Sequence, residues 1–400
     1  MSPPPLQVVS ISPASLKCAE VRKFTKSEKI SFEPVRYIKE QRMLKQMRLE
    51  KILGKSLEER ELEEEEVLFL LEQKEKVALD RIFETARRVR KRYFGSKVFL
   101  YSFVYFSTYC KNNCSFCYFR NSNNMPPRYR KSVDEIISTA KGMKEAGIHL
   151  IDLTMGEDPY FIDHPDRLTE IVRRVKDETK LPVMISPGVL PDEVIDELIR
   201  AGADWYALYQ ETHNSVLFGK LRAGQDYQAR LHAKEYAKKK GLLVEEGLLT
   251  GVGNQLAEYV ESFEYMKRLG ASQVRTMTFI PQKGSPMEEC EQSSFLSELL
   301  NIAVMRLIFP MLLIPASLDV DGLRGLEERL DAGANVITSI IPPKEGYAGV
   351  ANAVYDIDEG HRTIEGIQGS IRKCGLQAAT AEEYESWLQS RRNETGRLPA

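Results

Sequence analysis

The chain has 400 residues, of which 42 % are hydrophobic and 28 % are charged, and its formal net charge at pH 7 is −2. These values are typical of a globular protein with a large core, and they argue against the strongly basic surface that nucleic-acid binding requires. No apolar run reaches the ~20 residues that span a bilayer, so we expect no membrane partner and a cytoplasmic location.

The N-terminal part of the sequence changes character near residue 41. Residues 1–40 are rich in Pro, Ser and charge, and we expect them to form a disordered tail. From residue 41 to 96 apolar residues recur at helical spacing, as at Val67, Leu70 and Leu71, which predicts a helical segment. The glutamate run at 63–66 suits the start of a helix, because anionic groups are favourable at a helix N-terminus.

From residue 97 to 375, short β-rich runs alternate with amphipathic helical stretches, the pattern of parallel βαβ units. Eight strands are expected, at 98–105, 149–154, 181–186, 204–209, 242–249, 273–279, 312–317 and 335–338. Helices are expected near 133–146, 163–179, 191–201, 225–239, 256–269, 294–308, 322–331 and 361–375. Eight units predict an α/β fold of the (β/α)8 TIM-barrel type, whereas an open doubly wound sheet usually stops at five to seven strands. Catalytic groups should then follow the strands, and residues 376–400 are expected to form a C-terminal helix or tail.

Three of the six cysteines lie in the loop after the first expected strand, with the spacing C-x3-C-x2-C: Cys110, Cys114 and Cys117. Three thiolates on a short loop can hold three irons of a [4Fe–4S] cubane and leave the fourth iron open to a ligand. A zinc site is the alternative, but structural zinc takes four ligands, and the nearest histidine in sequence is His149. The remaining cysteines lack such spacing and predict no second cluster: Cys18, Cys290 and Cys374.

Aromatic residues flank the third cysteine, with Phe116 before it and Tyr118 after it. The motif therefore resembles the C-x3-C-x-Φ-C signature of the radical S-adenosylmethionine (SAM) superfamily. That resemblance implies a [4Fe–4S] cluster whose open iron binds the methionine end of SAM, and a deoxyadenosyl radical formed by reductive cleavage of SAM. The cofactors then carry the hard chemistry, and the superfamily also implies a one-electron donor such as flavodoxin or ferredoxin.

Charged residues after other expected strands look like the superfamily's SAM site. Glu157, after the second strand, resembles the glycine–glutamate element that meets the methionyl amino group; a simple glycine turn with a solvated acid is the plainer interpretation. Glu211 after the fourth strand and Arg230 on the next helix resemble the biotin-synthase and hydrogenase-maturase branch, where such groups bind the charged ends of SAM. An arginine suits the carboxylate, because its fork meets two oxygens at once. The implied set also includes Ser186, whose loop could equally be a plain turn, and Tyr118.

Three runs resemble a narrower family, the 3-methylornithine synthases, which are lysine mutases: Tyr105–Asn112, Ile151–Tyr160 and Ile314–Asp319. This resemblance covers roughly residues 41–375. It implies conversion of L-lysine to (3R)-3-methyl-D-ornithine, the first step of pyrrolysine biosynthesis.

The same resemblance implies that Arg275 holds the lysine carboxylate, that Asp152 and Asp319 hold its ammonium groups, and that Ser317 assists. The charges suit lysine, because its two ammonium groups and one carboxylate need acids and an arginine when they are buried. The plainer interpretation is that Arg275 and Asp319 form a structural ion pair inside the barrel.

Two alternatives stay open at this point. One is a biotin-synthase-like enzyme that acts on another amino acid, and the other is a non-catalytic iron–sulfur or zinc scaffold. A scaffold would have no use for the residues that are expected to face SAM. The basic runs at 87–92 and 128–131 are interpreted as solvated faces rather than as a nucleic-acid site.

Overall fold

The computed structural model describes residues 33–319, 322–341 and 362–394, and the chain divides into two compact units, Met1–Lys45 and Gln46–Ala400. Its first three helices are α1 (Glu33–Leu57), α2 (Glu64–Leu71) and α3 (Lys76–Phe94). The predicted limit of the tail at residue 40 is wrong, because residues 33–40 are helical; residues 1–32 lie outside the described part. The first part of α1 packs against no core, because its apolar side chains such as Tyr37 and Met43 are exposed. A helix of this kind needs no hydrophobic period, so its start could not be read from the sequence.

The glutamate run starts a helix, as predicted. Glu63 is the N-cap of α2, and its backbone N–H donates to the Glu66 carboxylate at 3.0 Å. The first turn of α2 is acidic throughout, which suits the positive end of the helix dipole.

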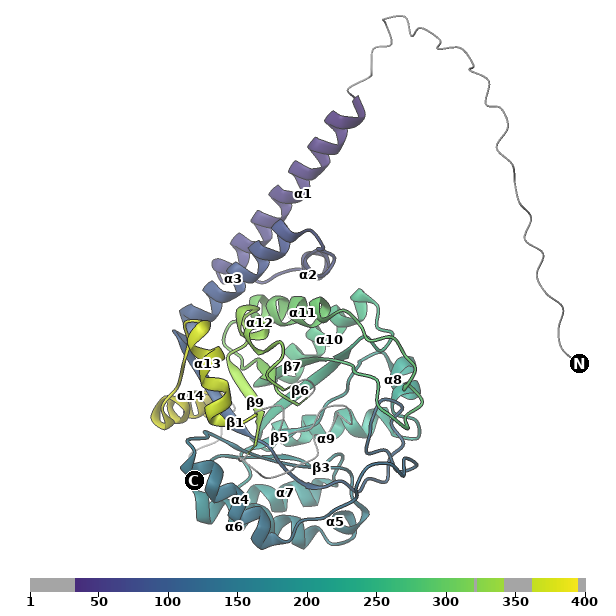
Figure 1. The fold of residues 1–400 in the computed structure, drawn as a ribbon, viewed down its shortest axis with the longest axis vertical. Helices are drawn as coiled ribbons and strands as arrows, with labels where there is room; N and C mark the ends of the chain where they lie inside the picture. The colour runs from purple at the N-terminus through teal and green to yellow at the C-terminus, as the bar shows by residue number, and fades with distance from the viewer. Residues whose placement is uncertain (1–32, 320–321, 342–361, 395–400) are drawn as a thin grey trace, which may run out of the picture. The chain divides into compact units, whose positions relative to one another are not determined.

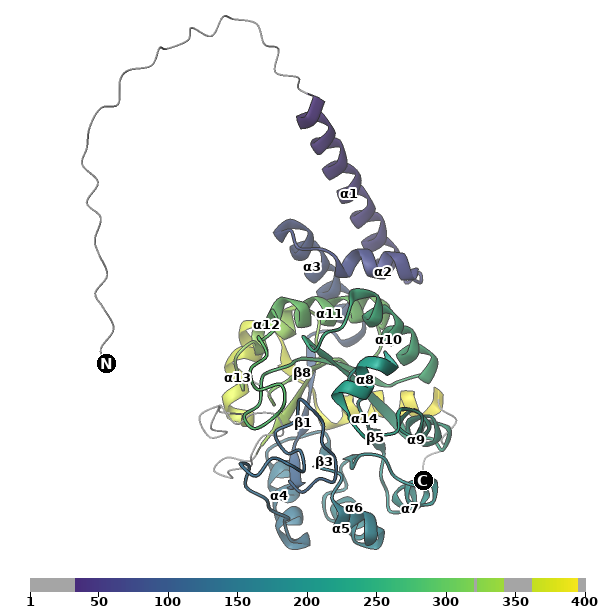
Figure 2. The ribbon, with the colours of Figure 1, turned by 90° about the vertical axis from the view of Figure 1, so that its right-hand side faces the viewer.

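Parallel strands form the centre of the second unit, and helices surround them (Figures 1 and 2). The strands are β1 (Lys97–Ser102), β2 (Val104–Ser107), β3 (Ile151–Met155), β4 (Val183–Ser186), β5 (Trp205–Ala207), β6 (Leu243–Thr250), β7 (Gln273–Thr278), β8 (Pro315–Ser317), β9 (Val336–Ile340) and β10 (Gln377–Ala378). They pair in two sheets, in the orders β10-β1-β9-β8 and β2-β3-β4-β5-β6-β7.

The single strand expected at 98–105 is two strands that meet at Phe103. β1 pairs with β9, and β2 pairs with β3, so this segment passes from one sheet to the other. Backbone hydrogen bonds join the two sheets at this seam, where Ser102 N–H donates to Leu150 O at 3.0 Å. At the opposite seam Val274 N–H donates to Leu313 O at 3.0 Å. When β1 and β2 are counted as one position and β10 is left out, eight strand positions follow one another in a ring. This arrangement confirms the predicted barrel.

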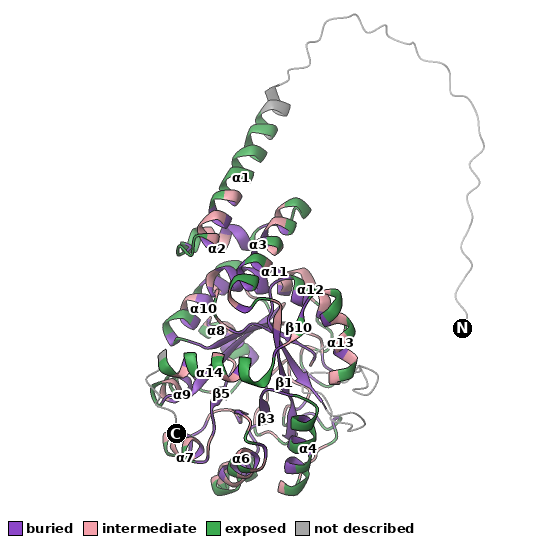
Figure 3. Ribbon diagram, turned by 90° about the vertical axis from the view of Figure 1, so that its left-hand side faces the viewer, coloured by how far each residue is buried: buried purple, intermediate pink, exposed green. Residues whose placement is uncertain are grey.

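The helices of the barrel turn buried residues to the strands and exposed residues to solvent (Figure 3). They are α4 (Val133–Glu145), α5 (Pro159–Asp163), α6 (Pro165–Thr179), α7 (Asp192–Arg200), α8 (Ser215–Leu221), α9 (Tyr227–Lys239), α10 (Leu256–Leu269), α11 (Phe295–Ile308), α12 (Leu326–Asp331), α13 (Ile364–Lys373) and α14 (Ala381–Glu394). α5 and α8 were not expected as separate helices. Both are single short helices in loops that follow strands, too short to show a hydrophobic period.

The C-terminal segment closes the N-terminal end of the barrel. β10 pairs with the start of β1, and α14 contributes Tyr384 and Leu388 to a buried cluster with the first residues of several strands, such as Phe99 and Trp205. The hydroxyls of Tyr101 and Tyr384 are 2.9 Å apart. The predicted domain limits at residues 96 and 375 stay predictions.

Candidate functional site

One cavity lies at the C-terminal ends of the strands, at the end opposite α14. Its lining includes the last residues of β3, β4, β5 and β7 and residues of the loops that follow them. It brings together ten of the twelve predicted site residues: Cys110, Cys114, Cys117, Asp152, Glu157, Ser186, Glu211, Arg230, Arg275 and Asp319. Among the described residues, the two other predicted ones do not line it. Tyr118 packs its ring beside Phe119 with centroids 5.4 Å apart, and Ser317 lies buried behind Arg275.

The cysteine loop follows β2 and is fastened to two other parts of the barrel. Lys111 N–H donates to Glu157 O at 2.9 Å, and Ser115 N–H donates to Leu221 O at 2.7 Å. These bonds fix the backbone between the first and last cysteine to the loop after β3 and to the end of α8.

Arg128 of the basic run holds this loop, so the interpretation of residues 128–131 as a solvated face is wrong for Arg128, whereas Arg130 is exposed. The Arg128 guanidinium donates to the backbone carbonyls of residues 108, 119, 120 and 123, at 2.5 to 2.9 Å. Arg130 forms a bidentate ion pair with Asp158, and each N–H···O distance is 2.8 Å. Asp158 also accepts from Ser107 Oγ and caps α5. These contacts were not predictable, because an arginine that binds backbone carbonyls has no sequence pattern of its own.

The three thiols are free and suit a cationic group. Burial raises the pKa of Cys110, and burial with the neighbouring Cys114 and Cys110 raises that of Cys117 well above its usual range. In the described ranges no three His, Cys, Asp or Glu side chains converge closely enough to hold one metal ion. A cubane makes a different demand, because each thiolate binds a different iron. The positive irons of a cluster would also offset the cost of three thiolates in a buried loop.

Glu157 stands between the cysteine loop and the helices that follow β5. Its Oε1 accepts from Arg230 Nη1 at 3.4 Å, and its Oε2 lies 3.5 Å from Lys111 Nζ. Two glycines make room for it. A Cβ on Gly188, which has φ +86°, would lie 2.0 Å from Glu157 Cγ, and a Cβ on Gly156 would lie 2.3 Å from a backbone oxygen of the cysteine loop. The loop after β4 is therefore not a plain turn, because it must carry glycine beside this carboxylate.

Glu211 sits at a strained corner after β5. It has a positive φ of 70°, and its Oε1 accepts from Arg222 Nη2 at 2.5 Å. Burial raises the pKa of Glu211, although Arg222 and Arg230 oppose that shift. Its second oxygen is buried without a hydrogen-bond partner in the described part of the chain, which is the state expected of a carboxylate that is completed by a ligand.

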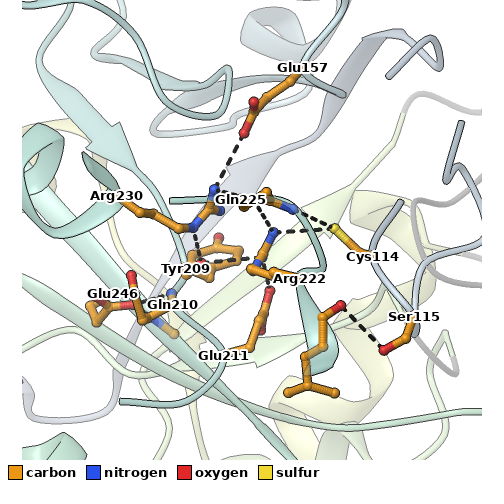
Figure 4. A network of polar contacts seen from close by, with 12 residues as sticks. Cys114, Ser115, Glu157, Tyr209, Gln210, Glu211, Arg222, Gln225, Arg230 and Glu246 are labelled. Carbon is orange, nitrogen blue, oxygen red and sulfur yellow. Dashed lines mark hydrogen bonds and ion pairs between the residues drawn. The ribbon is translucent and has the colours of Figure 1, made fainter. Parts of the chain in front are cut away.

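A buried polar network behind the strand holds this corner. Glu246 accepts the N–H groups of Gln210 at 2.7 Å and of Gly247 at 2.8 Å, and it pairs with fully buried Lys234. Gln210 precedes Glu211, so the network fixes the backbone from which Glu211 projects (Figure 4). Because buried Glu246 binds two backbone N–H groups next to Glu211, it stabilises the unfavourable positive φ of Glu211.

The other end of the cavity is lined by Arg275, Asp152 and Asp319, and Glu245 lies behind this lining against Arg275. Arg275 Nε donates to Glu245 Oε1 at 2.6 Å, and its Nη1 lies 3.4 Å from Ser317 Oγ. The alternative of an ion pair between Arg275 and Asp319 is wrong, because Asp319 pairs with Arg362, at 3.5 Å. Asp152 is buried beside Glu245, and burial raises its pKa to about 7, with the Glu245 charge adding to the shift.

Three site residues were not predicted: Arg222, Gln225 and Glu245. Two acids inside the apolar run of β6 were a usable signal, because a buried charge needs a partner. Glu245 pairs with Arg275, which lines the cavity, and Glu246 pairs with Lys234 of α9. Arg222 and Gln225 lie in the loop between α8 and α9, where no period or motif marks them.

Comparisons with known proteins agree with this geometry. The model of the radical SAM superfamily matches residues 104–266. The chain is 45 % identical over 341 residues to the 3-methylornithine synthase of Methanosarcina acetivorans, covering 85 % of this chain and 97 % of that protein. It is 32 % identical to the [FeFe] hydrogenase maturase subunit HydE of Thermotoga maritima over 64 % of this chain and 74 % of that protein. The crystal structure of methylornithine synthase (PylB) superposes with a TM-score of 0.80 at 44 % identity, covering 84 % of this chain and 99 % of that one.

Proposed function

Since the chain belongs to the 3-methylornithine synthase family of radical SAM enzymes, we propose that it converts L-lysine to (3R)-3-methyl-D-ornithine, and that its twelve predicted residues serve that reaction. The observation that carries the proposal is the single cavity, which joins three cysteines at one end to Arg275 and the carboxylates at the other. An enzyme of this class needs both ends in one enclosure, because the radical must reach the substrate without meeting water.

In this proposal Cys110, Cys114 and Cys117 hold a [4Fe–4S] cluster, and the methionine end of SAM lies between Glu157, Glu211 and Arg230. The cluster and SAM, when bound, supply a 5′-deoxyadenosyl radical. The protein's own groups would bind the cluster and SAM and orient them. Arg230 remains protonated at neutral pH for a carboxylate, although burial, and after it the charge of Arg222, lowers its pKa to about 10. The unpartnered oxygen of Glu211 is available to a donor of the ligand.

The charge of the far end fits free lysine. Three of the five charged groups at this end line the cavity, namely Asp152, Arg275 and Asp319. Glu245 pairs with Arg275 and Arg362 pairs with Asp319, so the five groups carry one net negative charge when all are ionised. Lysine carries two ammonium groups and one carboxylate, a net charge of +1, which balances the charge of these five described groups. An ammonium beside Asp152 would also return its raised pKa toward the usual range, because an opposite charge favours the ionised carboxylate.

The partners of the enzyme follow from the chemistry. We include a small electron-transfer protein such as flavodoxin or ferredoxin in the proposal, since reduction of the cluster needs one electron. Within the described ranges, no helix combines the length and the hydropathy needed to cross a membrane. Five cysteines of the described residues are free, and a thiolate cluster needs reducing surroundings, so we propose a cytoplasmic location.

The test is anaerobic reconstitution of the full chain with iron and sulfide, followed by SAM, a reductant and L-lysine. We expect 5′-deoxyadenosine together with an isomer of lysine of unchanged mass. Formation of 5′-deoxyadenosine with lysine unchanged would overturn the substrate and would favour the alternative, a biotin-synthase-like enzyme with another amino-acid substrate.

Two arginine variants separate the two ends of the cavity. Arg275→Ala should abolish lysine turnover and leave SAM binding unchanged, whereas Arg230→Ala should weaken SAM binding. Arg173→Ala, on the exposed face of α6, is the control for loss of one arginine. Loss of SAM binding in Arg275→Ala would contradict the assignment of the two ends.

A further inference from the structure

The loop between α8 and α9 brings two N–H donors to one cysteine sulfur. Gln225 Nε2 lies 3.0 Å from Cys114 Sγ, and Arg222 Nη1 lies 3.6 Å from the same atom (Figure 4). Both distances are within the range of hydrogen bonds to sulfur, which is a larger and softer acceptor than oxygen. Cys114 is 7 % exposed, so solvent competes little for the sulfur.

The orientation of the Gln225 amide is determined by its neighbours. Its Oε1 faces Arg222 Nη1 at 3.5 Å and Arg230 Nη1 at 3.3 Å. A guanidinium group offers only donors, so the amide must present its oxygen to the two arginines. Its NH2 group is thereby directed to Cys114, and the reversed amide would set donor against donor.

Arg222 is equally fixed. Its Nη2 donates to Glu211 Oε1 at 2.5 Å and to Tyr209 O at 3.2 Å, and its guanidinium lies over the Phe116 ring, 5.3 Å from the centroid. The side chain is buried with these partners. The two donors are therefore held in position by contacts within the chain itself.

Hydrogen bonds to a cluster sulfur change the energy of an added electron. Reduction increases the negative charge that the cluster shares with its thiolates, and N–H donors and a positive charge stabilise that form more than the oxidised form. The effect is larger in a buried site, where the local dielectric constant is low. We propose that Gln225 and Arg222 are positioning residues that raise the reduction potential of the cluster through Cys114. This inference rests on the proposed cluster site and adds residues that the sequence motif does not contain.

Gln225→Glu is the sharpest test. The glutamate keeps the length of the side chain and the oxygen that both arginines bind, and it loses only the N–H···S donor while adding a negative charge. Gln228→Glu makes the same chemical change on an exposed position of α9, three residues further on. Gln225→Leu removes the amide without adding charge and serves as a second variant.

The measurement is the midpoint potential of the reconstituted full-length protein without SAM, followed by electron paramagnetic resonance, with iron and sulfide contents determined in parallel. We expect Gln225→Glu to reduce the ratio of reduced to oxidised cluster at a fixed potential about tenfold or more, which is about 59 mV for one electron. Gln225→Leu should shift the potential in the same direction by less, and Gln228→Glu should match the wild type.

Several results would contradict the inference. Intact clusters with unchanged or higher potentials in both Gln225 variants would overturn it alone. So would loss of the cluster in both variants with retention in Gln228→Glu, because Gln225 would then hold the cluster and not tune it. A wild-type chain that assembles no cluster would overturn the proposed function together with this inference.

Discussion

Glu245 is the residue whose removal best tests how the lysine end of the cavity works. Its Oε1 accepts from Arg275 Nε at 2.6 Å, and its Oε2 accepts from the Tyr209 hydroxyl at 3.0 Å. Arg275 also lies over the Tyr209 ring, 5.3 Å from its centroid. We expect Glu245 to orient Arg275 so that the remaining N–H groups face the lysine carboxylate, and Glu245→Gln is the change that tests this role.

The magnitude follows from what the amide retains. Glutamine keeps an oxygen for Arg275 and the volume of the side chain, and it loses the negative charge of a fully buried group. The difference between a charge-assisted and a neutral hydrogen bond is about 1–2 kcal/mol. The cavity also loses the net negative charge that complements lysine. We therefore expect lysine to bind roughly fivefold to thirtyfold more weakly, with SAM affinity unchanged.

The assay is equilibrium binding of lysine to the reconstituted enzyme in the presence of SAM and without a reductant, so that no turnover occurs. Glu193→Gln, on the exposed face of α7, is the matched control. If lysine binds Glu245→Gln as tightly as the wild type, or more tightly, then Glu245 competes with the substrate for Arg275 instead of orienting it, and the reasoning is refuted.

Three further predictions concern other parts of the site. Gly188→Ala should push the Glu157 carboxylate aside and weaken SAM binding tenfold or more in titrations of the reconstituted enzyme, whereas Gly142→Ala, in open space on α4, should leave it unchanged. Asp152 has a pKa of about 7 when folded against an ordinary 3.8, so the folded chain holds a proton that the unfolded chain loses, and the ligand-free stability should fall as pH rises from about 4 to 7. In Asp152→Asn this part of the pH dependence of urea unfolding should disappear; its persistence would contradict the raised pKa. Arg128→Ala should lower the free energy of unfolding by about 3 kcal/mol and reduce the iron content after reconstitution, because four backbone carbonyls lose their donor; retention of both would contradict its role in the loop.

The sequence predicted the barrel because its strands and helices each carry their own period. The same periods place Asp152, Ser186 and Arg275 on strands, and the rule that strand ends carry function brings them to one cavity. The break at Phe103 was not predictable, because β1 and β2 form one uninterrupted apolar run and separate only through the partners that they pair with.

The partners of the charged residues were harder to predict than their positions. The ion pair of Arg275 with Glu245 instead of Asp319 depends on which way adjacent residues of β6 point, and on Arg362 reaching Asp319 from a distant segment. Tyr118 was expected at the SAM site from the resemblance to the superfamily; its ring packs beside Phe119 and is not part of the described cavity lining. Adjacency in a loop does not fix the direction of a side chain, since no periodic backbone imposes one.

The C-terminal segment, which packs Tyr384 and Leu388 against the N-terminal end of the barrel, has a consequence for synthesis on the ribosome. Lys97 and Val98 at the start of β1 pair with Gln377 and Ala378, and His149 Nε2 lies 3.0 Å from Ala379 O. The first strands therefore gain these neighbours only after nearly the whole chain has been synthesised. Domains form as they leave the ribosome, and contacts between distant parts of a chain form slowly. During synthesis, the N-terminal ends of β1 and β3 therefore stay uncovered until the C-terminal segment has been made. A truncated translation product would therefore keep the three cysteines while lacking Tyr384 and Leu388, which fill the opposite end of the barrel.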